Sequence, residues 1–121
     1  MGHFLTRAYV NERLRLKGAT SYRIVSSSGY GNRINSDRIL AFLNSPAVRR
    51  GVPETDFLPC DLMTAEEFAA SPELAESAIT PHDLLVWSKR KRDPIPHYRI
   101  NWHSRRYPRK ACLEWMERKF R

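Results

Sequence analysis

The chain has 121 residues, of which 41% are hydrophobic and 28% are charged, and its formal net charge is +8. This length suits one ordinary domain or two very small ones, and the composition excludes a chain that is disordered throughout. The N-terminal MGHFLTRAYV lacks the long apolar segment of a secretion signal, and no apolar run approaches the ~20 residues of a membrane span. We therefore expect a cytoplasmic protein that makes no use of a membrane.

The charge is divided into three blocks. Residues 1–50 carry nine basic and two acidic residues, 51–86 carry eight acids and no Lys or Arg, and 87–121 carry twelve basic and three acidic residues. Soluble proteins usually mix their signs, so two basic lobes around an acidic connector predict that both lobes face a polyanion. The densest stretch, Trp87–Lys110, holds nine Lys or Arg and one acid, Asp93. It is either a phosphate-binding face or a solvated basic end.

The first half of the chain predicts a helix, a second helix, a short hairpin and a third helix. Thr6 is a suitable N-cap for the first helix, and Lys17-Gly18 is expected to end it. Thr20 or Ser21 caps the second helix, and the composition of Ser26–Asn32 predicts a loop. Ser36, followed by Asp37, starts the third helix. The residues expected to face the core are Leu5, Val10, Leu14, Leu16, Ile24, Val25, Ile39, Leu40, Phe42 and Leu43.

The middle of the chain, Asn44–Pro59, is interpreted as a connector because three prolines and Gly51 interrupt any helix there. Two helix starts follow. Thr64-Ala65-Glu66-Glu67 has the pattern of a capping box, and Thr80-Pro81-His82-Asp83 places proline at the first helical position. Asp93–Pro96 is expected to stop the second of these helices.

The last part of the chain predicts a hairpin and a closing helix. His97–Trp102 alternates with period two, with Tyr98, Ile100 and Trp102 on the inner side and His97, Arg99 and Asn101 on the outer side. His103-Ser104 is the expected turn, Arg105–Tyr107 the returning strand, and Pro108 the opening of the last helix. The core residues expected from the helices are Phe68, Leu74, Leu84, Leu85, Trp87, Cys112, Trp115 and Met116.

The two halves show an internal repeat if the offset between matching residues is allowed to vary along the chain. Leu5 and Thr6 match Met63 and Thr64 at an offset of 58, Ile24 matches Leu84 at 60, and Phe42 matches Trp115 at 73. We therefore predict a unit at 1–45, a connector at 46–62 and a second unit at 63–121. Because ~40–60 residues are few for an independent core, the two units should pack together as one compact domain.

The second unit resembles the winged helix-turn-helix proteins of the MerR and excisionase type. The resemblance is carried by the threonine-capped helix at Met63–Phe68, the second helix at Thr80–Trp87, the proline-opened wing at Pro96–Ile100, its return at Arg105–Tyr107 and the closing Leu113–Met116. It covers about half of the chain well and the first half more weakly. The interruption at Ala70–Glu73 and the short, Gly-rich first wing depart from the family pattern. The fold class implied is mainly α with short β-hairpins, arranged as a tandem winged helix-turn-helix.

The resemblance implies a non-enzymatic protein that binds double-stranded DNA. Second helices would enter the major groove and wings would reach the backbone or minor groove. Arg23 is a candidate for a guanine contact, because its planar guanidinium fits two acceptors at once. The alternative is that it contacts only a phosphate or an acidic neighbour. Trp102 is interpreted as packing rather than as an intercalating wedge. The implied DNA-binding residues are Thr20, Ser21, Tyr22, Arg23, Asn32, Arg33, His82, Lys89, Arg90, Lys91, Arg92, Arg99, Asn101, His103, Arg105 and Arg106.

Tandem units of this kind are similar to accessory proteins of mobile elements and phages. The implied process is excision of an element, transcription regulation, conjugation or packaging, with a recombinase, relaxase or polymerase as a partner protein. A monomer is favoured over a homodimer, since an internal tandem can replace the usual dimer. Two alternatives stay open. One is a protein–protein adaptor that uses the acidic segment 51–86, and the other is RNA binding with bases stacked on Tyr22, Tyr30, Trp102 and Tyr107.

Catalytic and metal-site patterns are missing from the sequence. His3, His82, His97 and His103 have no zinc spacing with Cys60 or Cys112, and the two cysteines make no disulfide framework. Gly29-Tyr30-Gly31 is too short for a phosphate loop, and Ser26–Ser28 lacks the context of a nucleophile. We expect no enzyme activity, no cofactor and no metal.

Overall fold

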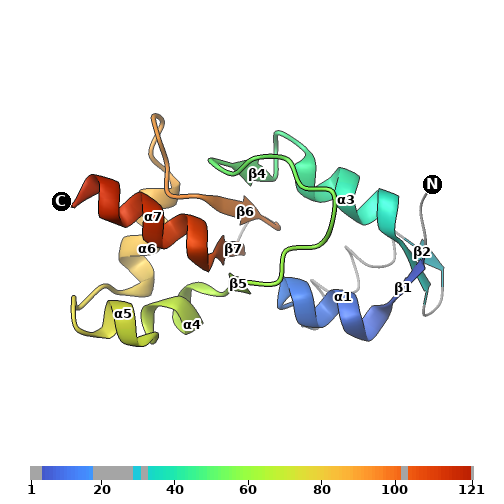
Figure 1. The fold of residues 1–121 in the computed structure, drawn as a ribbon, viewed down its shortest axis with the longest axis horizontal. Coiled ribbons are helices and arrows are strands. Elements are labelled where there is room, and N and C mark those ends of the chain that lie inside the picture. The colour runs from blue at the N-terminus through green and yellow to red at the C-terminus, as the bar shows by residue number, and fades with distance from the viewer. Residues whose placement is uncertain (1–3, 18–28, 31–32, 102–103, 121) are drawn as a thin grey trace.

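The structure is a computed structural model, and it describes residues 4–17, 29–30, 33–101 and 104–120. Within these ranges the chain forms six helices and two small antiparallel sheets. No helix in the described ranges combines the length and apolar character needed to cross a bilayer. Figure 1 shows an elongated arrangement, in which elements of the first half lie at one end and those of the second half at the other.

In the described part of the first half there are three short strands and two helices: β1 (Phe4–Thr6), α1 (Arg7–Leu14), β2 (Gly29–Tyr30), β3 (Arg33–Asn35) and α3 (Ser36–Asn44). The Thr6 hydroxyl accepts a hydrogen bond from the Tyr9 amide at 3.1 Å, which confirms the predicted N-cap. The predicted end of α1 at Lys17-Gly18 is wrong. The helix stops at Leu14 because Arg15 adopts the left-handed conformation, with φ 54° and ψ 47°.

The short hairpin expected in the first half is present, formed by β2 and β3. The predicted loop at Ser26–Asn32 is wrong for Gly29 and Tyr30, which form β2 and pair with Ile34 and Arg33 of β3. Pairing with the central strand β3 overrides the loop tendency of glycine. The helix predicted from Thr20 falls outside the described residues. The start of α3 is confirmed one residue from its expected cap, because the Asn35 side chain accepts from the Asp37 and Arg38 amides.

The segment interpreted as a connector supplies a strand of its own. β4 (Arg49–Arg50) pairs with β6 (His97–Arg99), and the flanking Val48 and Val52 are buried. Gly51 has φ +70°, and a Cβ placed there would lie 3.2 Å from the Pro94 carbonyl oxygen. Glycine is therefore required both by the backbone conformation and by the close approach of residues 94–96. The connector is a structural part of the second sheet.

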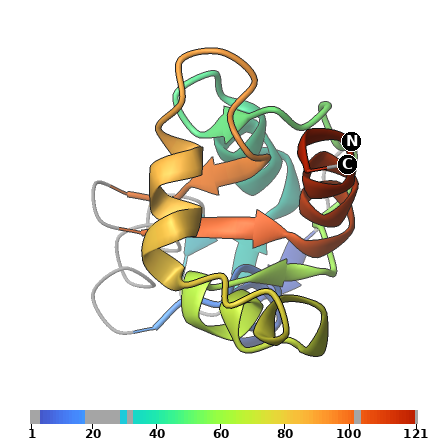
Figure 2. The ribbon, with the colours of Figure 1, turned by 90° about the vertical axis from the view of Figure 1, so that its left-hand side faces the viewer.

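The second half contains β5 (Leu62–Met63), α4 (Ala65–Ala69), α5 (Pro72–Ala75), α6 (Pro81–Ser88), β6, β7 (Arg105–Pro108) and α7 (Arg109–Lys119). Both helix starts are confirmed as capping boxes, Thr64 with Glu67 and Thr80 with Asp83. The expected break at Ala70–Glu73 separates α4 from α5. Figure 2 shows α6 and α7 flanking the β6–β7 hairpin, with α4 and α5 below it.

The two sheets share a strand order. The first is β1-β3-β2, and the second contains β5-β7-β6 in the same arrangement, with β4 added at the outer edge of β6. The registers also correspond. Leu5 pairs with Ile34 in the first sheet and Met63 pairs with Tyr107 in the second. These four residues are related by the offsets of 58 and 73 that the sequence comparison indicates.

Two buried clusters form the core, and the first includes residues from both halves. Leu62, Tyr98 and Ile100 of the second half pack with Leu14 and Ile39 of the first. The second cluster includes Phe68, Leu84, Tyr107 and Trp115. Because β6 is covered at this position, the predicted outward position of His97 is wrong. His97 is 2% exposed, and its ring lies 6.4 Å from that of Tyr107.

Candidate nucleic-acid interface

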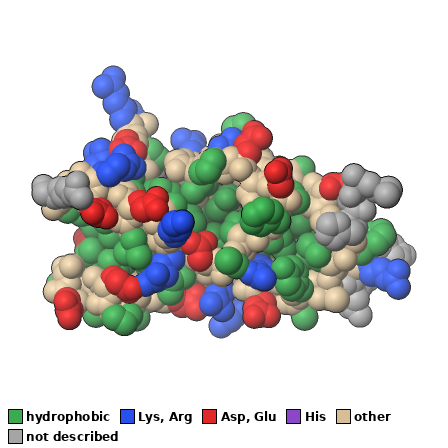
Figure 3. All heavy atoms as spheres, in the orientation of Figure 1, with side chains coloured by type: hydrophobic (Ala, Val, Ile, Leu, Met, Phe, Trp, Pro, Cys, Tyr) green, Lys and Arg blue, Asp and Glu red, His purple; other side chains and the backbone are tan. Residues whose placement is uncertain are grey.

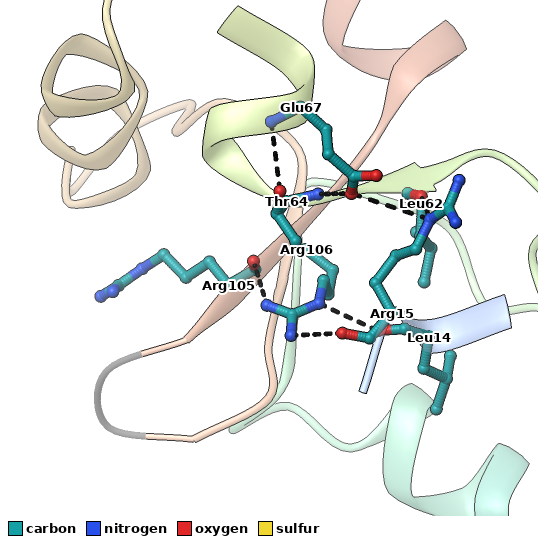
Figure 4. Close-up of polar contacts among 7 residues, drawn as sticks. All are labelled: Leu14, Arg15, Leu62, Thr64, Glu67, Arg105 and Arg106. Carbon is teal, nitrogen blue, oxygen red and sulfur yellow. Dashed lines mark hydrogen bonds and ion pairs between the residues drawn. The ribbon is translucent and has the colours of Figure 1, made fainter. Parts of the chain in front are cut away.

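The neighbouring arginines of β7 point in opposite directions, as alternation along a strand requires (Figure 4). Arg106 is 8% exposed. Its Nε donates to the Leu14 carbonyl at 2.9 Å, and its Nη2 donates to the Arg15 carbonyl at 2.7 Å. These carbonyls end α1, where the helix dipole favours a cation. The predicted position of Arg106 at an accessible wing tip is therefore wrong, because the side chain connects the two halves.

Arg15 makes the reciprocal connection from the end of α1 (Figure 4). Its Nε lies 3.4 Å from the Leu62 carbonyl oxygen and 3.7 Å from Glu67 Oε1. The Thr64 amide holds the pKa of Glu67 below its ordinary value, partial burial opposes this, and the Arg15 charge adds to the lowering. The two arginines therefore fix α1 against β5, α4 and β7, and they set the relative orientation of the halves.

The four cations Lys89–Arg92 form an exposed loop that follows α6, here called the basic loop. In Figure 1 this loop projects beyond the helices, and Figure 3 shows Lys and Arg side chains extending from the same corner. Among the described residues, no ion pair is recorded for any of the four. Arg90 lies over the Trp115 ring at 5.7 Å. The basic loop thus offers concentrated, uncompensated positive charge.

Asp93 anchors the end of the basic loop to α7. Its backbone is left-handed, with φ 49°, and its carbonyl accepts from Trp115 Nε1 at 3.1 Å. The carboxylate lies 2.7 Å from Lys119 Nζ and 3.8 Å from Arg118 Nη1. The hydrogen bond from Lys119 is the main cause that lowers the pKa of Asp93 below its ordinary value. Desolvation opposes this shift, and the charges of Lys119 and Arg118 add to it. Asp93, the single acid of the predicted basic stretch, therefore pairs with cations of α7 and does not neutralise the cations of the basic loop.

Three other arginines form ion pairs within the protein. Arg49 pairs with Glu54, Arg109 with Glu73, and Arg15 with Glu67. These arginines contribute to the fold, and they differ from the cations of the basic loop, for which no ion pair is recorded among the described residues.

A groove of about 430 Å³ lies between the start of α6 and β7. His82 on α6 is exposed, and it lines the groove together with Ser104 and Arg105. The outer surface of α6 also carries Val86, which is 48% exposed. The described part of this helix therefore presents an imidazole and an aliphatic side chain where base contacts were expected, and the positive charge lies in the basic loop and beside the groove.

Arg50 is a basic residue that the sequence interpretation missed. It pairs with His97, whereas Arg99 pairs with Arg105. Directly paired residues, and residues two apart on one strand, share a face of the sheet, so the three arginines lie on the same side. The sequence around Arg49-Arg50 has no period-two pattern, because the strand is two residues long and its pairing partner, β6, is distant in the chain.

The predicted DNA-binding residues do not form one group. Arg33 is exposed on the first sheet, at the opposite end of the molecule from the basic loop (Figure 1). Asn101 lies at the β6–β7 turn, where its amide and carbonyl bond to Ser104. Arg105 faces the groove, and Arg106 is buried. The predicted residues that lie outside the described part of the chain are Thr20, Ser21, Tyr22, Arg23, Asn32 and His103.

His97 should make the stability of the protein sensitive to acid. Burial is the main cause that lowers its pKa from 6.5 to about 4, and the charges of Arg105, Arg50 and Arg99 contribute, while the bond to the Ile95 carbonyl opposes the shift. Between these pKa values the unfolded chain binds the extra proton. Stability is therefore fully present above about pH 6.5 and falls by up to ~1.4 kcal/mol per pH unit toward pH 4.

Urea unfolding of the wild type and His97→Asn between pH 7 and pH 4.5 measures this effect. The variant should lose the part of the pH dependence that the imidazole causes. His82→Asn, at an exposed position, is the matched control and should keep it. Equal pH dependence in wild type and His97→Asn would show that His97 does not cause the acid sensitivity.

The described residues contain no group of three or more His, Cys, Asp and Glu side chains that could hold a metal ion. Cys112 is buried, donates to the Pro96 carbonyl at 3.0 Å, and has a pKa raised by desolvation, whereas Cys60 is exposed. The chemistry that the described site offers is the binding of anions by the cations of the basic loop and by Arg105.

Comparison with protein-family models, curated proteins and solved structures found no match.

Proposed function

We propose that this protein binds double-stranded DNA without catalysing a reaction, as a tandem of two winged helix-turn-helix units. The observation that carries the proposal is the uncompensated charge of the basic loop, which is placed between α6 and the β6–β7 hairpin. Duplex DNA is a dense array of phosphates, and it attracts such charge through release of its counterions. The repeated strand order and matching register support the tandem arrangement.

Most acidic residues of the segment 51–86 interact with other groups of the same protein, which favours DNA binding over the adaptor alternative. Five of the eight acids in 51–86 have partners inside the protein. Glu54, Glu67 and Glu73 pair with arginines, the Asp61 carboxylate accepts from the Lys110 amide, and Asp83 caps α6. These acids balance the basic lobes. They are therefore less available to bind a basic partner protein.

RNA binding is also less favoured. Of the four aromatic residues suggested as stacking platforms, Tyr107 is 1% exposed, and its ring packs beside Phe68. Tyr22 and Trp102 lie outside the described residues. A buried ring cannot stack on an unpaired base, and the uncompensated cations suit the regular backbone of a duplex.

In the proposed role the protein acts by occupying a DNA site of a mobile element or phage. The process is excision, transcription, conjugation or packaging, and the partner protein is a recombinase, relaxase or polymerase. The major-groove contribution of α6 comes through His82, and backbone contacts through the basic loop supply most of the affinity. The protein should therefore bind many duplex sequences with similar strength, with a preference that is modest in comparison with its salt dependence.

Fluorescence anisotropy with labelled duplex DNA, single-stranded DNA and a structured RNA tests the proposal. If about 6–8 phosphates are contacted, the association constant for the duplex should fall by roughly 10³–10⁴-fold between ~50 and ~200 mM salt. Failure to bind the duplex at ~50 mM salt would refute the proposal. Tighter binding of the structured RNA would favour the RNA alternative instead.

A further inference from the structure

Three arginines lie on one side of the four-stranded sheet, and strand register places them there. Arg99 of β6 is directly opposite Arg105 of β7. Two residues back along β6, His97 is opposite Arg50 of β4. Alternation sends Tyr98 and Arg106 to the other side, where they meet the core and the end of α1. We call Arg50, Arg99 and Arg105 the arginine cluster.

The arrangement is unfavourable in the free protein. Like charges directly opposite each other on neighbouring strands destabilise a sheet. Arg105 Nε is buried and has no hydrogen-bond partner among the described residues, and no ion pair is recorded there for Arg105. Burial is the main cause that lowers the pKa of Arg105, the Arg99 charge adds to it, and Tyr107 opposes it. Unpartnered buried donors are rare, and one explanation for them is a bound ion.

The neighbours of the arginine cluster come from three further elements. The groove beside Arg105 is lined by His82 and Leu85 of α6, by Glu66 of α4 and the N-cap residue Thr64, and by Ser104 at the hairpin turn. Glu66 is the acid among the residues that line it. The charges that act on the buried His97 from this side are those of Arg105, Arg50 and Arg99. The environment of the cluster is therefore polar and dominated by positive charge.

We propose that the arginine cluster binds consecutive phosphates of a duplex DNA backbone, with one phosphate between Arg99 and Arg105. A phosphate presents several acceptors, and the planar guanidinium suits them. This inference rests on the proposed function and names the backbone site within it. It moves the contact from the tip of the hairpin to the side of the sheet that faces α6.

A site built from opposed like charges has a signature that a structural arginine lacks. Removing one charge should relieve repulsion in the free protein and weaken binding of the anion. Stability and affinity should therefore change in opposite directions. Removing an arginine that only supports the fold would lower stability and leave the salt dependence of binding unchanged.

The experiment compares Arg105→Met and Arg50→Met with Arg118→Met, in thermal melting and in binding to a labelled ~30-bp duplex over a salt series. Methionine keeps the apolar stem and removes the charge. Arg118→Met removes the same charge from α7, where Lys119 still pairs with Asp93. For Arg105→Met we expect an unchanged or higher Tm, a roughly tenfold weaker Kd and a salt slope smaller by about one. Arg50→Met should show the same changes in binding.

The outcomes separate this inference from the proposed function. If the wild type binds no duplex, both fail. If the wild type binds and both cluster variants keep the affinity and salt slope of Arg118→Met, the cluster proposal fails and the DNA-binding proposal stands. A lower Tm for Arg105→Met with unchanged binding would assign Arg105 a structural role. Arg50 lies on an exposed edge strand, so Arg50→Met still tests the site if Arg105→Met does not fold.

Discussion

Replacing Lys89, Lys91 and Arg92 together by glutamine is expected to weaken duplex binding by on the order of 10²-fold at ~0.1 M salt. Each phosphate neutralised on B-DNA contributes about 0.9 to the slope of log K against log salt, so the slope should fall by between about two and three. The three side chains are exposed and have no ion pair among the described residues, so their loss should leave the fold intact. Arg90 is retained because it lies over the Trp115 ring.

Anisotropy titrations at four or more salt concentrations would measure this slope directly. The control is a triple variant with the same change in net charge, Arg38→Gln, Lys110→Gln and Arg118→Gln, at exposed positions outside the basic loop. If the basic loop contacts the DNA, the control should lose much less affinity. If both variants lose affinity equally, only the net charge matters, and the loop is not a contact surface.

Replacing Arg106 by methionine is expected to destabilise the protein by about 2–4 kcal/mol, because two carbonyls at the end of α1 lose a charged donor. For a chain of this size the expected fall in Tm is roughly 8–15 °C. Arg106→Lys should recover only part of the loss, since an ammonium cannot reproduce the two-pronged geometry of the guanidinium. Differential scanning calorimetry measures the effect.

The neighbouring Arg105→Met is the matched comparison for this prediction, because the two substitutions are chemically identical and one residue apart. Arg106→Met should fall well below the wild type, whereas Arg105→Met should not. A Tm for Arg106→Met within about 2 °C of the wild type would mean that the bonds to α1 contribute little to stability. The contrast would also show that only one of the two neighbouring arginines of this hairpin is needed for the stability of the fold.

Local sequence signals predicted the helix starts well. Thr6, Thr64 and Thr80 were identified because a capping interaction lies within one helical turn, where the sequence alone determines the partners. The break at Ala70–Glu73 followed from Pro72 in the same way. The end of α1 was mistaken because Arg15, and not a glycine, adopts the left-handed conformation. Its bonds to Leu62 and Glu67 come from a distant segment.

The site was predicted less completely, because burial depends on tertiary contacts. The alternation of β6 was identified correctly, but His97 was assigned to solvent because a second covering layer on that face has no local signal. Arg105 and Arg106 looked equivalent in the sequence, and only the position of α1 distinguishes them. Arg50 was missed because its strand has two residues, and only its pairing with His97 places the Arg50 side chain beside Arg99 and Arg105.

The pairing of β4 with β6 has a consequence for how the chain can be divided. A fragment that begins at Met63 would leave the outer edge of β6 with free amides and carbonyls, and it would also lose Leu62 from the partner strand of β7. Open strand edges of this kind promote association between chains. The unit that repeats along the polypeptide is therefore shorter than the unit that folds cooperatively. A fragment of the second half should therefore begin before Val48, so that β4 covers the edge of β6 and the fragment does not associate through it.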